Sequence, residues 1–268
     1  MVSLSLCVDE LVLTLAEPAQ VRAVSRLAAD PRYSRVWQLA QVLPRHDGLA
    51  EQVVALEPDL VIAASFEHGR TTELLRQLGI EVRTLPSPST LADVPASLRL
   101  LAGWLGTEAR TERLLAQWQH TLDAAKHNAI TTNKHVSSLS HTRPMPLALS
   151  LAPNAYSPGQ LSLKNEVLRW TGYRTAADEL GLRYDSELTL EQIVLLQPDV
   201  LFLEEQQGNR DALAYRMLEH PALQHSHLQR VAVTSADWLC PGLGVAAMAA
   251  ELAHARDTLF AAETEPPQ

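Results

Sequence analysis

The chain has 268 residues, a formal net charge of −9 and 46% apolar residues, which is enough material for one large or two medium domains with real cores. The acidic balance and the lack of any basic run argue against a protein that binds nucleic acid. No apolar stretch approaches the length of a membrane span, and two cysteines exclude a disulfide-rich scaffold.

The first half of the chain alternates short apolar runs with segments of helical periodicity. We predict strands at 2–6, 21–24, 60–64 and 81–85, and helices at 8–15, 51–56, 71–78 and up to Leu105. Such alternation is typical of an α/β fold in which helices cover both faces of a parallel sheet.

The next stretch, Thr107 to Asn128, reads as one helix after the stop at Gly106. Its apolar stripe at helical spacing consists of Leu114, Leu115, Trp118, Leu122 and Ala125. We interpret it as the connector of a two-lobed protein whose function lies in a cleft between the lobes. The alternative is an ordinary helix inside one large domain.

The second half repeats the alternation after a polar connector at 130–145. We predict strands at 147–151, 200–203 and 231–234, helices at 163–171, 190–196, 211–218 and 245–259, and a disordered tail at 261–268. The predicted domains are therefore an N-terminal lobe at 1–106, a connecting helix at 107–129 and a C-terminal lobe at 130–260.

An internal repeat supports two lobes. EQVVALEPDLVIA, from Glu51, aligns without gaps on EQIVLLQPDVLFL, from Glu191, at a constant offset of 191 − 51 = 140, with six identities. In each copy a proline stops the helix, an aspartate occupies the turn and an apolar strand follows. The repeat indicates duplication of one α/β unit.

Ligands of open parallel sheets bind at the carboxyl ends of the strands, which gives candidate site positions. The aromatic residues there are Phe66, Tyr156, Tyr184 and Trp238. They would give a broad flat ligand apolar walls, or they would fill the core. Arg26 and Arg70 would pair with ligand carboxylates, or lie on the solvated surface.

Cys7 and Cys240 also fall at predicted strand ends, one in each predicted lobe. They would form a disulfide, ligate a metal or be small buried residues. His220, His225 and His227 follow a helix and precede a strand, so we expect a solvated loop at the opposite edge of the sheet. His68 is the one histidine at a strand's carboxyl end. No hydrolase, P-loop, zinc-protease or dinucleotide motif supports catalysis.

Several stretches, in this order and spacing, carry a resemblance: VSLSLCVDELVLTL, AVSRLAADPRYS, GLAEQVVALEPDLVIAASF, LLRQLGIEVRTLPSPSTL, LSLAPNAYSPG, LTLEQIVLLQPDVLFLE and SADWLCPG. Together they resemble the substrate-binding proteins of ABC importers with the helical-backbone fold, the receptors for cobalamin and ferric siderophores. The resemblance implies two Rossmann-like lobes with parallel sheets joined by a single long backbone helix. It also implies a monomeric receptor, not an enzyme, with cobalamin or a ferric siderophore as ligand.

Together with the strand-end positions, the resemblance implies a set of ligand-binding residues: Ser5, Cys7, Arg26, Phe66, Arg70, Asn154, Tyr156, Tyr184, Trp238 and Cys240. In that family an acidic side chain on each lobe docks to basic residues of the permease. The candidates are Glu67 or Glu73 in the first lobe and Glu204 or Glu205 in the second. Ordinary surface carboxylates are the alternative for each.

The N-terminus lacks the basic region of a signal peptide, and acids at Asp9 and Glu10 interrupt its apolar run. The family implies a periplasmic protein whose leader is missing here; a genuine start would imply a cytoplasmic relative with a scavenging or regulatory role. The main alternative to the receptor, ahead of the cytoplasmic relative, is a tetrapyrrole metal chelatase of similar architecture, for which Glu67 and His68 are the only nearby acid and histidine.

Overall fold

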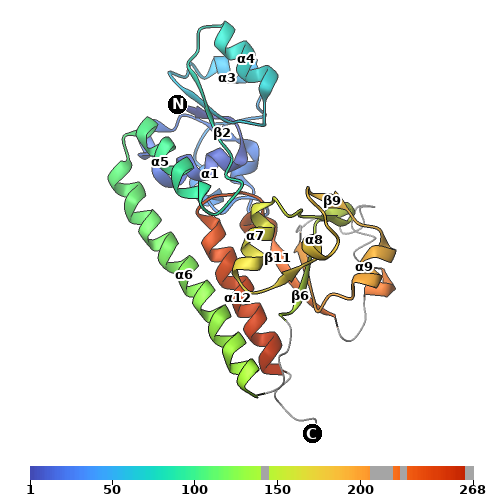
Figure 1. Ribbon diagram of the computed structural model, residues 1–268. Helices are drawn as coiled ribbons and strands as arrows, with labels where there is room; N and C mark the ends of the chain where they lie inside the picture. Colours follow the sequence, from blue (N-terminus) through green and yellow to red (C-terminus); the bar gives the residue numbers. More distant parts are fainter. Residues whose placement is uncertain (140–144, 206–219, 224–227, 263–268) are drawn as a thin grey trace. The chain divides into compact units, whose positions relative to one another are not determined.

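The computed structural model describes residues 1–139, 145–205, 220–223 and 228–262 (Figure 1). The chain forms two compact units: residues 1–117 with 235–244, and residues 118–234 with 245–268. Residues 235–244 thus belong to the first unit although their neighbours on both sides belong to the second. The predicted lobe boundaries stay a prediction, and the compact units differ from them at this segment.

The first unit is an α/β unit built on short parallel strands. Its strands are β1 (Val2–Ser3), β2 (Val24–Ser25), β3 (Arg45–His46), β4 (Val61–Ala64) and β5 (Val82–Leu85). Its helices are α1 (Leu6–Leu15), α2 (Trp37–Ala40), α3 (Ala50–Ala55), α4 (Gly69–Gln77), α5 (Asp93–Leu105) and α11 (Ser235–Trp238), with 3-10 turns at Pro18–Gln20 and Arg26–Ala29. The sheet order is β1-β4-β5, β2 pairs with β3, and a bridge from Val2 to Ala23 brings β2 beside β1, all in parallel.

The core of the first unit follows the apolar pattern of these strands. Val61, Ile62 and Ala63 of β4 are fully buried because helices cover both faces of a parallel sheet. A cluster of buried side chains surrounds them: Val2, Leu4, Ala23, Ala50, Val53 and Leu75. The parallel α/β arrangement predicted from the sequence is therefore confirmed in this unit.

Helix α6 (Glu108–Leu139) is longer than the predicted helix. The predicted stripe is largely correct, because Leu115, Trp118, Leu122 and Ala125 are buried. The polar connector that we expected from residue 130 is instead helical as far as Leu139. No glycine or proline occurs between residues 107 and 139, so nothing in the backbone stops the helix where its apolar stripe ends.

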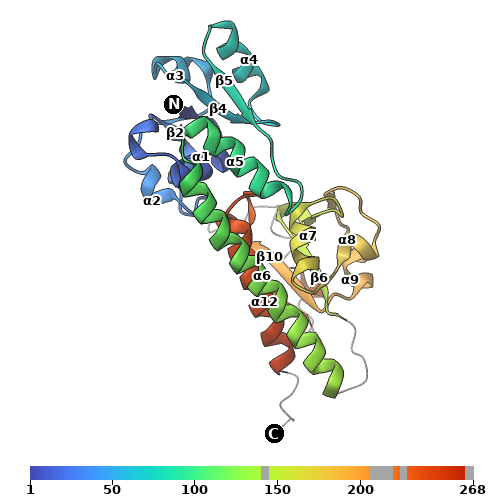
Figure 2. The same ribbon diagram turned by 60° about the vertical axis from the view of Figure 1, so that its left-hand side comes forward.

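The second unit has a four-stranded parallel sheet in the order β11-β10-β6-β8. Its strands are β6 (Leu147–Leu151), β7 (Tyr156–Ser157), β8 (Arg174–Thr175), β9 (Ser186–Glu187), β10 (Val200–Glu205) and β11 (Gln229–Thr234). Its helices are α7 (Leu163–Trp170), α8 (Ala176–Glu179), α9 (Leu190–Leu196) and α12 (Gly244–Ala262), with 3-10 turns at Pro153–Ala155 and Pro221–Leu223. The part of α6 in this unit lies beside α12 in both views (Figures 1 and 2).

Two predicted elements of the second half fall partly or wholly outside the described residues. The helix predicted at 211–218 lies there, as does the tail from residue 263. Residues 261 and 262, which we assigned to the tail, are the last two of α12. In the part of the chain that is described, no helix is long and apolar enough to cross a membrane.

The two copies of the sequence repeat fold alike in detail. Asp59 forms an ion pair with the amino group of Met1 at 3.1 Å, and Asp199 accepts a hydrogen bond from the backbone N–H of Leu147 at 2.7 Å. In both units the aspartate of the Pro-Asp turn thus holds the backbone nitrogen at the start of the first strand. The residue before each proline also matches, since Glu57 and Gln197 both adopt positive φ, at 46° and 49°.

Replacement of Asp199 with alanine is expected to lower the free energy of unfolding by about 1–2 kcal/mol, because it leaves a partly buried N–H at the edge of β6 without its acceptor. Thermal unfolding followed by circular dichroism measures the change. Asp123→Ala is the control, since Asp123 accepts only an exposed hydrogen bond from Gln119 on the same helix. Equal melting temperatures for the two variants would contradict the role assigned to Asp199.

Candidate functional site

Half of the predicted ligand-binding residues follow strands of the first unit's sheet. Since β1, β2, β4 and β5 run in one direction, the segments that follow them leave the sheet at the same edge. The segment 65–68 after β4 exposes a large aromatic side chain, because Phe66 retains 67% of its accessible surface. An exposed phenyl ring at this edge is suited to a flat apolar ligand.

The two predicted arginines differ in their availability. Arg26 makes a bidentate ion pair with Asp47, with Nε to Oδ1 at 2.7 Å and Nη2 to Oδ2 at 2.8 Å. The same pairing lowers the pKa of the Asp47 carboxyl. Arg26 is therefore already occupied by a carboxylate of its own chain, whereas Arg70 is exposed on the first turn of α4.

Ser5 is buried rather than open to a ligand, which corrects the prediction for that residue. It precedes α1 and lies among other buried polar atoms. The hydroxyls of Ser3 and Ser5 and the Oδ1 atom of Asp9 are buried and make no hydrogen bond with any described residue. The other carboxylate oxygen of Asp9 accepts hydrogen bonds from the hydroxyl and the backbone N–H of Ser25. Asp9 thereby ties α1 to the carboxyl end of β2.

Cys7 and Cys240 form a disulfide with a Cα–Cα distance of 5.1 Å. Of the three alternatives left open by the sequence, the disulfide is the one observed. Both cysteines lie in the first compact unit, although Cys240 falls within the C-terminal lobe that the sequence predicts. The reason is that residues 235–244 leave the second unit after β11 and pack on the first. The bond therefore fastens this segment to the start of α1.

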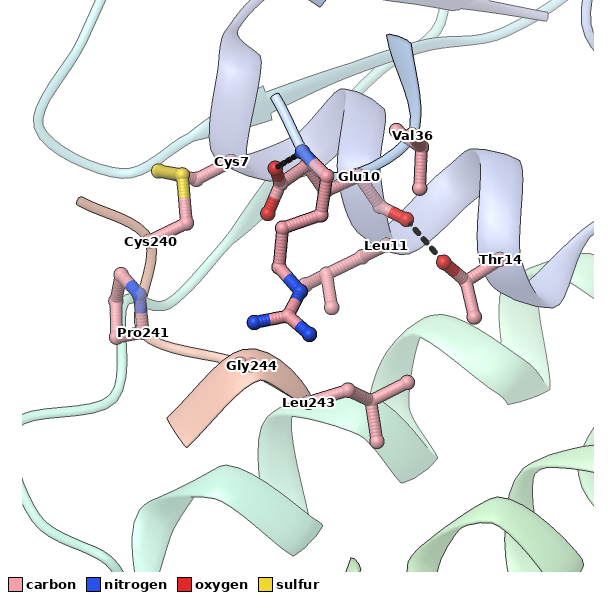
Figure 3. A pocket seen from close by; sticks show the side chains of 11 residues that line it. Cys7, Glu10, Leu11, Thr14, Val36, Cys240, Pro241, Leu243 and Gly244 are labelled. Carbon is pink, nitrogen blue, oxygen red and sulfur yellow. Dashed lines mark hydrogen bonds between the residues drawn. A yellow bond between two sulfur atoms is a disulfide. The ribbon is translucent and has the colours of Figure 1, made fainter. Parts of the chain in front are cut away.

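The disulfide borders a cavity of about 250 Å³ within the first unit (Figure 3). Its lining consists of Cys7, Glu10, Leu11, Thr14, Arg35, Val36, Cys240, Pro241, Gly242, Leu243 and Gly244. The backbone N–H of Arg35 donates to the Glu10 carboxylate at 2.8 Å, and the Thr14 hydroxyl donates to the Glu10 carbonyl at 2.6 Å. The cavity is smaller than the 300–1,000 Å³ typical of cofactor sites.

Trp238 is buried, with 3% of its surface accessible, and therefore offers no open wall to a ligand. It ends α11, inside the segment that the disulfide fastens. Of the two roles that the sequence left open for Trp238, ligand wall or core, its burial fits the core.

A histidine pair lies near the carboxyl end of β3. His46 is buried, and both of its ring nitrogens are engaged: Nε2 lies 2.8 Å from the Ser3 carbonyl oxygen and Nδ1 accepts the Gly48 N–H at 3.0 Å. Burial lowers the pKa of His46, which favours the neutral ring that this pairing requires. His68, half-buried at the start of α4, lies against Gly48. The sequence identified His68 as a candidate, but it gave no sign that the His68 ring packs against Gly48.

The second unit presents two exposed tyrosines at the antiparallel pair of β7 and β9. Tyr156 is the first residue of β7 and is 49% exposed, and Tyr184 lies just before β9 and is 65% exposed. Asn154 is exposed and adopts positive φ at 59°, a conformation that asparagine tolerates better than most residues. These three predicted residues are thus accessible.

Tyr184 is carried on a backbone that is closely packed. Gly159 approaches it so tightly that an added Cβ would lie 2.3 Å from the Tyr184 carbonyl carbon. The Gly159 N–H donates to the Asp185 carboxylate at 2.8 Å, and the guanidinium of Arg183 lies 5.5 Å from the Tyr184 ring centroid. The ring is therefore exposed but its point of attachment is fixed, as a preformed binding surface requires.

The sequence pattern of the periplasmic binding protein family matches residues 1–227 of this chain. The chain belongs to the periplasmic binding protein family. The match covers more than four-fifths of the sequence and includes both copies of the repeat.

Three relatives illustrate the range of this periplasmic binding protein family. The uncharacterized ABC transporter substrate-binding lipoprotein YvrC of Bacillus subtilis is 26% identical over 56% of this chain and 47% of its own length. The vitamin B12-binding protein of Vibrio parahaemolyticus is 25% identical over 70% of this chain and 64% of its own length. The apo structure of the periplasmic heme-binding protein RhuT from Roseiflexus sp. RS-1 superposes with a TM-score of 0.77, at 23% identity, over 96% of this chain and 97% of that one. The chain thus spans between about half and two-thirds of the curated relatives, and the structure shows the common fold.

The acidic residues predicted to dock to a permease are not equivalent in this periplasmic binding protein. Glu73 is exposed on α4, and Glu67 is half-exposed in the loop before it. Glu204 is buried and lies 3.7 Å from the Lys164 ammonium, so it is not an exposed docking acid. The backbone of Glu205 ends β10, and its side chain lies outside the described residues.

Metal ligands do not gather anywhere in the described part of this periplasmic binding protein. Within that part, no three His, Cys, Asp or Glu side chains are placed to hold a metal ion. Of the histidine cluster in the sequence, His220 is exposed, and His225 and His227 lie outside the described residues. A site for a bare metal ion therefore has no support here.

Proposed function

We propose that this protein is the solute receptor of an ABC importer and that its ligand is a large metal chelate of the cobalamin, haem or ferric-siderophore type. The proposal includes an extracytoplasmic location and a permease partner. It is supported by family membership, by relatives described as vitamin B12- and heme-binding proteins, and by the chemistry of the exposed loops. Cobalamin and a ferric siderophore are the ligands that the sequence suggested.

The observation that carries the proposal is the placement of exposed aromatic side chains. Soluble proteins bury most large aromatic side chains, because burial removes about 150–250 Å² of largely apolar surface per side chain from water. Here Phe66 in the first unit and Tyr156 and Tyr184 in the second keep between 49% and 67% of their surface accessible. Phe66 lies on the loop that follows β4, at the carboxyl end of a parallel strand, where ligands of open sheets bind. Tyr156 begins β7 and Tyr184 lies just before β9, its antiparallel partner. Broad conjugated or catecholate ligands bury such rings.

The test is co-elution in gel filtration. The protein is mixed separately with cyanocobalamin, haemin and ferric siderophores, and the visible spectrum of the protein peak is recorded. A coloured peak with one compound is expected and identifies the ligand. Colourless protein with every compound would overturn the proposed ligand class.

Replacement of Phe66 or Tyr184 with alanine is expected to weaken binding of the compound found above by about tenfold or more, because each removes the apolar contact of an anchoring ring. Equilibrium titration of ligand absorbance measures the change. Val42→Ala and Leu195→Ala are matched controls, since these apolar side chains are 86% and 82% exposed and lie neither on the segment after β4 nor beside the pair of β7 and β9. Equal affinities for all four variants would contradict the assignment of the site.

The chelatase hypothesis is tested by a second assay, with a divalent metal ion and a free porphyrin. An enzyme of that class would insert a divalent metal ion into a free porphyrin with turnover, whereas a receptor would form a reversible complex. Glu67 and His68 are adjacent on the loop before α4, with His68 held against Gly48. Metal insertion that depends on both residues would replace the receptor proposal.

A further inference from the structure

The disulfide between Cys7 and Cys240 lies at the wall of the cavity in the first unit, which both cysteines line (Figure 3). Cys7 is half-buried, as are Glu10 and Thr14 of the same lining, and Arg35 is exposed, so the cavity is open to solvent. Disulfides that solvent reaches are the ones that thiols reduce most readily. A small thiol therefore has a route to this bond that does not require the unit to unfold.

The bond fastens a short segment of chain to α1. Residues 235–244 belong to the first unit, whereas the chain before and after them belongs to the second. Within the segment, α11 has only four residues, which is too short for a helix to be stable without tertiary contacts. Part of the packing is made by backbone alone, since a Cβ on Gly242 would lie 3.1 Å from Leu11. The order of the segment therefore depends on its covalent anchor.

Both ends of the bond lie on segments that follow parallel strands. Cys7 is the second residue of α1, which follows β1, and residues 235–244 follow β11 directly. Ligands of open parallel sheets bind where such segments leave the strands. A ligand that meets a disordered segment must order it first, which costs affinity. The state of the disulfide is thereby connected to the binding surface.

Reduction of this bond is a thiol–disulfide exchange with a dithiol as the two-electron reductant. One reductant thiolate attacks Sγ of Cys240, the S–S bond breaks, and its electron pair leaves with Sγ of Cys7. The start of α1 stabilises this leaving thiolate, because Cys7 lies in the first turn and Ser5 makes no side-chain capping bond, while the Glu10 carboxylate opposes it. The second reductant thiol then attacks the mixed disulfide and releases Cys240. Both thiol protons of the reductant end on the cysteines, and the reductant leaves as a disulfide.

We propose that the Cys7–Cys240 bond is a redox switch. A small dithiol enters the cavity and reduces the bond, residues 235–244 are released from α1, and affinity for the ligand falls. The last step rests on the proposed receptor function and adds regulation to the same site. The oxidised protein is then the form that binds the ligand tightly.

Access through the cavity is tested by the rate at which dithiothreitol reduces the native protein. The rate is expected to rise in proportion to dithiothreitol concentration. Val36→Phe places a larger side chain in the cavity lining and is expected to slow reduction by about fivefold or more. Val42→Phe is the matched control, since Val42 is 86% exposed and does not line the cavity. A wild-type rate that does not depend on dithiothreitol concentration, or equal rates for the two variants, would overturn the proposal.

Release of the segment is measured by amide hydrogen exchange on the oxidised and the reduced protein. The amides of residues 235–244 are expected to exchange about tenfold or more faster after reduction, because local opening no longer has to overcome the covalent anchor. The amides of β10 in the second unit are expected to change much less. Equal exchange of residues 235–244 in the two forms would overturn the switch.

The effect on the ligand is measured by titration with cyanocobalamin, haemin and ferric siderophores, after dithiothreitol has been removed without oxygen so that it does not reduce the compounds. Affinity for the compound that binds is expected to fall by about three- to tenfold on reduction and to return on reoxidation. Equal affinities of the oxidised and reduced protein would overturn the switch and leave the receptor proposal standing. Failure of every compound to bind the oxidised protein would overturn the receptor proposal, and with it the effect on affinity, whereas faster exchange on reduction would still support the release of residues 235–244.

Discussion

Replacement of Cys7 and Cys240 with serine is expected to lower the free energy of unfolding by about 2–5 kcal/mol. The bond closes a loop with a sequence separation of 233 residues, and the restriction of the unfolded chain grows with loop length. It is also the bond that fastens residues 235–244 to α1 in the first unit. Loss of the disulfide is therefore expected to weaken the attachment of this segment before the rest of the unit unfolds.

Close packing at this segment explains why it would be sensitive to the loss. A Cβ on Gly242 would lie 3.1 Å from Leu11, and one on Gly244 would lie 3.3 Å from the Arg35 side chain. Glycine at both positions allows a close approach that the disulfide holds in register. Without the bond, the same approach must be maintained by packing of Trp238 and by backbone that has no side chain to anchor it.

The measurement is the denaturant midpoint of oxidised wild type, reduced wild type and the double serine variant. The two last samples are expected to agree with each other and to unfold at lower denaturant than the first. Limited proteolysis followed by mass spectrometry is expected to show faster cleavage within residues 235–244 in both. A midpoint that reduction leaves unchanged would contradict the stabilising role of the disulfide.

The fold was largely predictable because its signals are local. The apolar run of β4, the stop at Pro58 and the matching Pro198 specify helix, turn and strand within a few residues of each other. The extension of α6 to Leu139 was missed because the apolar stripe fades after Ala125 while the backbone still favours helix. The placement of residues 235–244 was missed because it depends on contacts more than 200 residues away in sequence.

The candidate site was less predictable, because exposure is decided by neighbours. Phe66 and Tyr184 are exposed as expected, but Trp238 in a similar sequence context is buried. Arg26 is engaged by Asp47, and Glu204 is buried beside Lys164. Sequence position at a strand end identifies the right edge of the sheet. It does not reveal which side chains at that edge already have partners within the chain.

Asp9 is the second site at which we expect a large effect on the free energy of unfolding. Its side chain is fully buried in α1, and Ser25 donates two hydrogen bonds to one carboxylate oxygen while the other oxygen has no described partner. Burial raises the pKa of Asp9 from its ordinary value of 3.8 to about 7, against the opposing effect of the Ser25 hydrogen bonds and of the neighbouring Ser3 hydroxyl. The folded protein therefore binds a proton here that the unfolded chain releases at lower pH.

The direction of the pH dependence follows from this pKa. As pH rises, the unfolded chain ionises at Asp9 first, so the contribution of Asp9 to the free energy of unfolding is fully present below about pH 4 and lost by about pH 7. The loss is expected to be on the order of 2–4 kcal/mol. Exposed carboxyls such as Asp47, whose pKa is lowered mainly by Arg26, act in the opposite sense and lose their contribution as pH falls. The pH dependence of wild-type stability alone therefore combines these two opposing contributions.

Asp9→Asn separates the two contributions, because the amide keeps an acceptor for Ser25 and carries no charge. At pH 8 we expect the variant to be more stable than the wild type by about 1–3 kcal/mol, and at pH 5 we expect the difference to shrink towards zero or reverse. Denaturant unfolding at intervals between these values measures the crossover. Asp47→Asn is the control and is expected to show a difference of the opposite sign. Parallel curves for wild type and Asp9→Asn would mean that Asp9 does not titrate in this range, and that the buried carboxyl is paired more strongly than its two hydrogen bonds from Ser25 indicate.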